Sequence, residues 1–389
     1  MAGIVVRPRS RIFHGHDWIY QTEILKTFGD PEPGEVISIK DGRDRLLGSA
    51  IYNPRSQIVA RRFSRQRQEL DRDFFLRRIE QAAGFRKKWL NDRNPGRLVW
   101  SESDGLPGLI IDRYASHFVL QTLTLAMDQR KHLIVEALQQ LFSPDSIVER
   151  NDVPIRKAEG LPLVAGLLYG QVPEVLTIDV QGSRFQIDLQ SGQKTGFYLD
   201  QIDNYAEVAR LAGGKRVLDC FSNQGAFALA CARAGATSVT AVESNEALAG
   251  VIEQNARLNG VQIDARNDNV FDFLAARTEQ ASHYDLIVLD PPSFAKSRES
   301  LDSAWRGYKE IHLRALQLLS DEGFLVTFSC SHHVSRTMLL EVVVEASVDA
   351  KRHLRIIKPL GQPLDHPILP HLPETEYLKG FIFQRIPGR

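Results

Sequence analysis

Three apolar runs in the second half of the chain each end in residues suited to ligand binding or chemistry. Residues 217–220, 285–289 and 324–329 have the length and composition of buried strands. The first run leads into a small-residue loop, the second into an aspartate with two prolines, and the third into a cysteine. In an open parallel sheet, the carboxyl ends of the strands face the ligand crevice. If the three strands are parallel, the loop, the carboxylate and the thiol meet in one pocket.

The rest of the chain predicts two further modules before this one. Residues 1–68 alternate short β-rich runs with turn signals, which is typical of a small β-barrel. Residues 71–90 have the apolar spacing of an amphipathic helix, and residues 97–189 follow the order strand, strand, helix, strand, strand. After Gly192, strands and helices alternate, which predicts a mostly parallel sheet covered on both faces.

We therefore expect an α/β protein with three domains. The first is a β-barrel over residues 1–68, and the second is a linker helix with a central α+β domain over 71–188. The third is a Rossmann-like domain over 189–389. A chain of 389 residues is long enough for two or three such cores.

The amino-acid composition limits the cellular location and the kinds of partner that we expect. Three cysteines without CxxC or Cys/His ligand patterns argue against a disulfide scaffold and against a metal site, and they favour a cytoplasmic protein. No apolar run approaches the roughly 18 residues that span a membrane. The 48 basic and 48 acidic residues cancel, so binding to nucleic acid requires a local basic surface. The N-terminal module offers candidate arginines for it, although such runs are commonly solvated faces; they are Arg7, Arg9, Arg11, Arg61, Arg62, Arg65 and Arg67.

The first loop indicates a cofactor site. Asp219 lies at a strand end, and Gly225 opens the next helix, where backbone can approach a ligand closely. The single glycine is a poor match to a diphosphate cradle. Glu243 ends the next strand, 24 residues after Asp219, the distance at which an acid binds ribose hydroxyls. Asp268 or Asn269, at the following strand end, can bond an adenine amino group. Together these residues favour S-adenosylmethionine over NAD, with generic α/β packing as the alternative.

Cys330 indicates the chemistry. Asp290, held by Pro291 and Pro292, fits several methyl transfers, including attack by an exocyclic amine. Carbon 5 of cytosine is a poor nucleophile, and thiolate addition at carbon 6 makes carbon 5 reactive. Cysteine suits this step because its thiolate is strongly nucleophilic. We expect Cys330 to be the nucleophile and Asp290 to bond the N3/N4 edge of the base, whereas Cys220 and Cys231 have the pattern of buried apolar residues.

Further segments make the chain resemble the PUA-domain-containing, class I S-adenosylmethionine-dependent rRNA cytosine-5 methyltransferases of the RlmI type. The segments that carry the resemblance are residues 15–20, 52–57, 103–109, 152–156, 193–201, 365–367 and 376–380. The resemblance implies a PUA RNA-binding barrel, a central domain, a Rossmann-like methyltransferase, 23S rRNA as substrate class and a homodimer. It also implies that Lys194, Thr195 and Phe197, in the segment 193–201, flank the cofactor. The full expected cofactor set is Lys194, Thr195, Phe197, Asp219, Phe221, Ser222, Gly225, Glu243, Ser244, Asp268, Asn269, Asp290 and Pro291.

Two alternatives stay open at this point. An enzyme of the same fold could methylate a ring or exocyclic nitrogen of a purine through the Asp290 corner. A non-catalytic protein could bind S-adenosylmethionine and RNA during ribosome assembly, with the β-barrel supplying affinity. Related RNA cytosine methyltransferases carry a second cysteine after the motif's proline, where this chain has Pro292 and Ser293.

Overall fold

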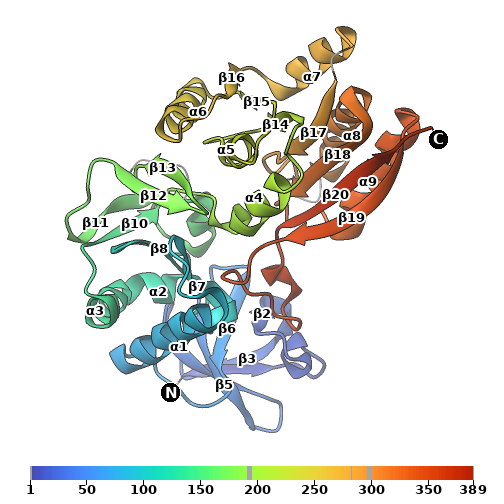
Figure 1. Ribbon diagram of the computed structural model, residues 1–389. Coiled ribbons are helices and arrows are strands. Elements are labelled where there is room, and N and C mark those ends of the chain that lie inside the picture. The colour runs from blue at the N-terminus through green and yellow to red at the C-terminus, as the bar shows by residue number, and fades with distance from the viewer. Residues whose placement is uncertain (1, 191–194, 282, 296–299, 389) are drawn as a thin grey trace. The chain divides into compact units, whose positions relative to one another are not determined.

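The computed structural model describes residues 2–190, 195–281, 283–295 and 300–388 (Figure 1). The chain forms two compact units. The first unit comprises residues 1–178, 186–199 and 364–375, and the second comprises 179–185, 200–363 and 376–389. The division into three domains at 1–68, 71–188 and 189–389 stays a prediction.

The first unit begins with a six-stranded sheet in the order β2-β6-β5-β4-β1-β3. Its neighbours are antiparallel except for the parallel pair β1 and β4. Isoleucines and valines from alternate positions fill its interior, as expected for strands buried on one face. The strands are β1 (Gly3–Val6), β2 (Trp18–Tyr20), β3 (Ile24–Phe28), β4 (Val36–Lys40), β5 (Leu46–Tyr52) and β6 (Ile58–Ser64).

A five-stranded sheet in the order β11-β10-β9-β8-β7 forms the rest of this unit's β structure. Helix α1 (Arg72–Leu90) begins where predicted, because the Asp71 side chain accepts a hydrogen bond from the Phe74 amide at 2.8 Å. It packs on α3 and β7 through a shared apolar core. The other elements are β7 (Gly96–Trp100), β8 (Leu109–Tyr114), β9 (His117–Thr122), α2 (Leu125–Gln129), α3 (Lys131–Phe142), β10 (Ser146–Asn151) and β11 (Val164–Gly170).

The second unit contains a seven-stranded sheet in the order β16-β15-β14-β17-β18-β20-β19. The five strands from β16 to β18 are parallel, and β20 is inserted antiparallel between β18 and β19. This confirms the predicted Rossmann-like, mostly parallel sheet. The strands are β14 (Arg216–Cys220), β15 (Ser238–Glu243), β16 (Asp264–Asn267), β17 (Tyr284–Leu289), β18 (Leu319–Ser329), β19 (His353–Gly361) and β20 (Lys379–Ile386).

Helices cover both faces of this sheet (Figure 1). Helices α7, α8 and α9 share one apolar core with the strands, and α4 packs on α5 on the other face, where Phe227 stacks on Phe328 at 5.5 Å. The helices are α4 (Ile202–Ala209), α5 (Ala226–Arg233), α6 (Glu246–Leu258), α7 (Val270–Glu279), α8 (Leu301–Leu318) and α9 (Arg336–Asp349). A hairpin of β12 (Leu176–Val180) and β13 (Ser183–Ile187) precedes them.

Short 3-10 helices connect several of these elements. They are η1 (Arg11–His14), η2 (Gln21–Glu23), η3 (Ser101–Asp104), η4 (Pro154–Glu159), η5 (Leu199–Gln201) and η7 (Pro373–Thr375). Among the described residues, no helix combines the length and the apolar character that crossing a membrane requires. Within the same ranges, His, Cys, Asp and Glu side chains form no group of three that could hold a metal ion.

Candidate active site

Strand register brings the predicted site residues of the second unit to one edge of its sheet. Cys220 at the end of β14 pairs with Val242 of β15 and with Leu289 of β17, and Leu289 pairs with Thr327 of β18. The residues at or just after these strand ends therefore lie near one another, at the edge where parallel sheets bind ligands. They are Phe221, Glu243, Asp290 and Cys330.

The loop after β14 is held in a conformation that few residues adopt. Phe221 and Asn223 have φ angles of 62° and 53°, and Gly225 has a φ of 80°. A Cβ atom at Gly225 would lie 3.0 Å from the Cγ2 atom of Ile252, so glycine is needed for both space and backbone angle. Gly225 caps α5 at its N-terminus, as predicted.

Asp219 is buried at the base of this loop. Its Oδ2 atom accepts hydrogen bonds from the Ser222 hydroxyl at 2.5 Å and from the Ala228 amide at 3.1 Å. Its Oδ1 atom is buried and has no hydrogen-bond partner within the part of the chain that the structure describes. Burial raises the pKa of Asp219 to about 7. A carboxylate with a buried, unpartnered oxygen is suited to receive a cationic amine from a ligand.

Glu243 is held at the end of β15 by backbone amides. Its Oε2 atom accepts from the Asn223 amide at 2.9 Å, and its Oε1 atom accepts from the Asn245 amide at 3.0 Å. The first of these bonds links the β15 end to the glycine loop. Ser244, which follows, is exposed and donates a long hydrogen bond of 3.4 Å to Oε1 of Glu243.

Asp268 and Asn269, which follow β16, make different hydrogen bonds. Asn269 caps α7, because its side-chain oxygen accepts from the Phe271 amide at 2.9 Å. The amide of Asp268 donates to the Glu243 carbonyl at 3.2 Å, and the Asp268 side chain is exposed. Of the two, Asp268 thus keeps its carboxylate available for a ligand.

Asp290 is positioned by a residue that sequence reasoning did not single out. Its Oδ2 atom accepts a hydrogen bond from the Gln201 side-chain amide at 3.0 Å. Gln201 is almost fully buried and is oriented by Asn204, whose amide donates to the Gln201 Oε1 atom at 2.6 Å and to the Gly361 carbonyl at 3.0 Å. In the sequence, the only indication of a role for Gln201 was that it lies in segment 193–201, one of the segments that carry the family resemblance.

Cys330 differs from the other two cysteines in its exposure. Cys220 and Cys231 are buried, as predicted, and burial raises the pKa of each thiol. Cys330 is partly exposed and follows β18 at the same sheet edge as Asp290. Only a thiol with access to the edge can meet a ligand, so Cys330 is the cysteine suited to chemistry.

An aromatic and polar layer from α8 lies beneath Cys330. The Tyr308 hydroxyl is 2.9 Å from the Ser329 hydroxyl, and the Tyr308 ring lies 4.8 Å from that of Phe294, just after the two prolines. Burial raises the pKa of Tyr308 to about 12, and Cys330 and Asp290 both act on it electrostatically. His312 is buried against Thr327, and burial lowers its pKa to about 4, so it is neutral at pH 7. Phe294 also contacts Phe221 of the first loop at 6.3 Å between ring centres.

Three predicted cofactor residues belong to the first unit or lie outside the described residues. The Thr195 hydroxyl donates to the Asp112 carboxylate at 2.6 Å, and the Phe197 amide donates to the Tyr114 hydroxyl at 3.1 Å. Lys194 lies outside the described residues. The cofactor roles of these three stay predictions.

Two of the seven arginines predicted to form a basic surface are engaged in ion pairs within the first unit. Arg62 is buried and pairs with Asp17 at 2.7 Å, and Arg61 pairs with Glu102 at 2.6 Å while stacking on Trp18. These two arginines stabilise the first unit internally. The other five are exposed; they are Arg7, Arg9, Arg11, Arg65 and Arg67.

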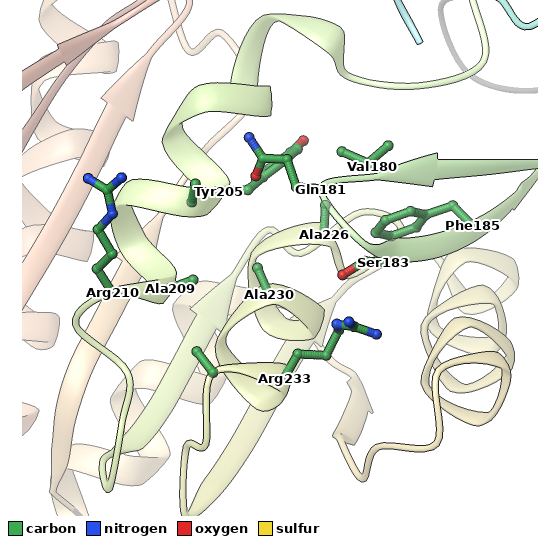
Figure 2. A pocket seen from close by; sticks show the side chains of 12 residues that line it. Val180, Gln181, Ser183, Phe185, Tyr205, Ala209, Arg210, Ala226, Ala230 and Arg233 are labelled. Atoms are coloured by element: carbon green, nitrogen blue, oxygen red, sulfur yellow. The ribbon is translucent and has the colours of Figure 1, made fainter. Parts of the chain in front are cut away.

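A separate hollow of about 500 Å³ opens between the hairpin tip, α4 and α5 (Figure 2). Its lining comes from residues that were not predicted to act in the site. The lining residues are Val180, Gln181, Ser183, Phe185, Tyr205, Ala206, Ala209, Arg210, Ala226, Ala230, Arg233 and Ala234.

Comparison with known proteins defines the class. The family model of S-adenosylmethionine-dependent methyltransferases matches residues 161–383, and that of PUA-like domains matches residues 7–65. The protein SMU.776, solved in complex with SAH, shares the fold with a TM-score of 0.85 at 22% identity, over 99% of this chain and 100% of that one. This chain is an S-adenosylmethionine-dependent methyltransferase with a PUA-like domain.

Closer relatives define the family. The protein named ribosomal RNA large subunit methyltransferase I in Yersinia pseudotuberculosis is 40% identical over 387 residues, which cover 97% of this chain and 98% of that protein. The protein of the same name in Yersinia pestis gives the same values of 40%, 97% and 98%. The chain belongs to this family, which confirms the resemblance drawn from its motifs.

Proposed function

We propose that the chain methylates carbon 5 of a cytosine in large-subunit (23S) ribosomal RNA through a covalent adduct with Cys330. The name of its relatives supports ribosomal RNA as the substrate. The observation that carries the cytosine-5 chemistry is Cys330, a partly exposed thiol at the same sheet edge as Asp290. A purine nitrogen needs no such thiol, because its lone pair attacks directly.

The chemistry divides between these two residues. The Cys330 thiolate forms a bond to carbon 6 of the ring, which places electron density on carbon 5. When bound, S-adenosylmethionine supplies an electrophilic methyl group that the activated carbon 5 accepts. Methyl transfer leaves S-adenosylhomocysteine; a general base then accepts the carbon 5 proton, the electron pair of that bond re-forms the double bond between carbons 5 and 6, and the sulfur–carbon 6 bond breaks to regenerate the thiolate. Asp290, held by Gln201, bonds the N3/N4 edge of the base, and a proton shared there with N3 neutralises the negative charge that thiolate addition places on the ring.

The same edge provides the cofactor contacts that we propose. Asp219 offers an unpartnered, buried oxygen to the cationic amine of the methionine part, and Glu243 offers its carboxylate to the ribose. Asp268 is the better candidate for the adenine amino group, because Asn269 caps α7. The remaining proposed contacts come from Lys194, Thr195, Phe197, Phe221, Ser222, Gly225, Ser244, Asn269, Asp290 and Pro291.

The partners follow from this function. RNA binding would use the PUA-like domain, for which residues 7–65 match the family model. Base access requires an extruded or single-stranded cytosine. A cytoplasmic location follows from a ribosomal substrate, and a homodimer is proposed from the family resemblance, with light scattering as its measurement.

The deciding experiment is methyl transfer with the Cys330→Ala variant. Turnover on ribosomal RNA should be lost while affinity for S-adenosylhomocysteine is retained, and Cys231→Ala, which alters a buried cysteine of α5, should keep turnover. Bisulfite sequencing of 23S rRNA from cells with and without the gene identifies the product. Full activity of Cys330→Ala would exclude the thiol mechanism and favour the purine alternative; cofactor binding without turnover on any RNA would favour a non-catalytic role.

A further inference from the structure

Lys379 is a buried lysine beside the loop that carries Cys330. Lys379 is the first residue of β20 and pairs in the antiparallel ladder with Ser329, the residue before the cysteine. Its Nζ atom donates a hydrogen bond of 2.8 Å to the carbonyl oxygen of Ser331, the residue after the cysteine. Lys379 is only 4% exposed. Both neighbours of Cys330 are thus tied to Lys379, Ser329 through the strand ladder and Ser331 through the ammonium group.

Burying a lysine ammonium group is unfavourable unless hydrogen bonds or an opposite charge compensate for its lost hydration. Burial lowers the pKa of Lys379 to about 8, while Glu376 and Cys330 act in the opposite direction. Glu376 is itself paired with Arg336 at the start of α9, at 2.9 Å. The charge of Glu376 is therefore shared with Arg336, and the thiol of Cys330 is the second acidic group that acts on Lys379.

Two titratable groups of α8, Tyr308 and His312, lie close to the end of β18 and are neutral at pH 7. Tyr308 and Ser329 contact each other beneath the thiol, and Tyr308 stays protonated because its pKa is raised to about 12. His312, deeper in α8, is neutral because burial lowers its pKa to about 4. Asp290 adds a negative charge, which disfavours a thiolate. The ammonium group of Lys379, bonded to the residue after the cysteine, opposes this effect.

We propose that Lys379 is a positioning residue whose ammonium group holds Cys330 in the thiolate form. A neighbouring cation favours a thiolate in the way that lysine, arginine and imidazolium do at other reactive cysteines. No bond to Lys379 forms or breaks, and its proton stays on Nζ through addition and elimination. The importance for catalysis rests on the proposed function, whereas the effect on the thiol itself is measurable without any RNA.

The test is the pH dependence of Cys330 alkylation by iodoacetamide in the full-length chain, with the modified peptide quantified by mass spectrometry. Cys220 and Cys231 are buried, so their peptides report only unfolding. In the wild-type protein the alkylation midpoint should lie below the ordinary cysteine value of about 8.5. A midpoint at or above that value overturns the proposal without any variant.

Variants then assign the effect to the charge. Lys379→Met keeps the length of the side chain and removes the ammonium, so alkylation at pH 7 should slow about tenfold or more, as for a shift of one pKa unit. Lys379→Arg should keep most of the wild-type rate. Lys358→Met is the matched control, because Lys358 lies on the neighbouring strand β19 with an exposed side chain paired to Glu207.

The outcomes separate this inference from the proposed function. An unchanged midpoint in Lys379→Met, with a melting temperature near that of the wild type, contradicts the role of Lys379 whatever the enzyme methylates. Slow alkylation in Lys379→Met, rescued in Lys379→Arg, supports it even if Cys330→Ala proves active on RNA. If Lys379→Met fails to fold, the wild-type midpoint and Lys379→Arg decide the question.

Discussion

At the scale of single residues, Asp219 has the most distinctive electrostatic environment of the site. It is fully buried, it has one oxygen without a hydrogen-bond partner among the described residues, and its pKa is raised to about 7. A carboxyl group must lose its proton before it can bind a cationic amine. If Asp219 binds the amine of the cofactor as proposed, cofactor affinity and the ionisation of Asp219 are linked.

We therefore expect the affinity for the cofactor to rise with pH. Since the protonated form dominates below pH 7, affinity for S-adenosylhomocysteine should rise about tenfold between pH 6 and pH 8 and then level off. Asp219→Asn should weaken binding at pH 8 and abolish the rise. Isothermal titration calorimetry measures both, with Asp264→Asn, at an exposed residue paired to Arg266, as the control. A flat profile for the wild-type protein contradicts the prediction.

The sequence predicted which residues at strand ends would lie close together. It did not predict the residues that long-range packing brings to the same sheet edge. Asp219, Asp290 and Cys330 were placed together because parallel strands end at one edge. Gln201 and Lys379 reach that sheet edge only because distant segments pack there, and their only signal in the sequence was their place in the segments 193–201 and 376–380 that carry the family resemblance. Arg61 and Arg62 illustrate the same limit, because their carboxylate partners Glu102 and Asp17 are distant in sequence.

At the scale of elements, the helices were more predictable than the edge strands. The apolar spacing of residues 71–90 predicted a helix, and α1 spans Arg72–Leu90. Strand β11 (Val164–Gly170) was missed, because as an edge strand it has few buried side chains and contains two glycines. A strand without fully buried side chains and with two glycines carries a weak β signal in the sequence.

The glycine loop between β14 and α5 allows a sharp test. Gly225→Ala places a Cβ at a φ of 80° and 3.0 Å from Ile252, so the loop must shift. We expect a loss of roughly 1–2 kcal/mol in unfolding free energy from the backbone alone, with further loss from the contact, and weaker cofactor binding. Urea unfolding and calorimetry with S-adenosylhomocysteine are the measurements.

A second glycine at the other end of α5 is the matched control. Gly235 has a φ of 86°, and a Cβ there meets no atom within 4 Å. Gly235→Ala should therefore show only the backbone cost and keep full cofactor affinity. Equal cofactor affinities for the two variants would show that the contact with Ile252 does not shape the loop.

At the scale of the whole molecule, the charges balance at 48 basic and 48 acidic residues, so RNA binding would require a local basic surface. Arg65 and Arg67 are exposed at the end of the first sheet, whereas Arg62 is buried in an ion pair. Replacing Arg65 and Arg67 with glutamine should lower the slope of log Kd against log salt by about two, because each phosphate contact releases counterions.

The comparison with Arg62 separates binding from stability. Arg62→Gln leaves Asp17 without its buried partner, so thermal unfolding should occur at lower temperature while the salt slope stays near the wild-type value. Filter binding across a salt series and differential scanning calorimetry make the two measurements. An unchanged slope in the double variant would place the RNA contact on another surface.

The insertion of β20 between β18 and β19 also has a consequence for protein synthesis. Its residues, Lys379–Ile386, are translated after every other strand of that sheet, and they fill a gap beside the cysteine-bearing strand. A nascent chain still lacking them would present an open β18 edge and no ammonium near the thiol. If Lys379 favours the thiolate as proposed, Cys330 becomes fully reactive only after translation has passed this segment and β20 has paired with β18.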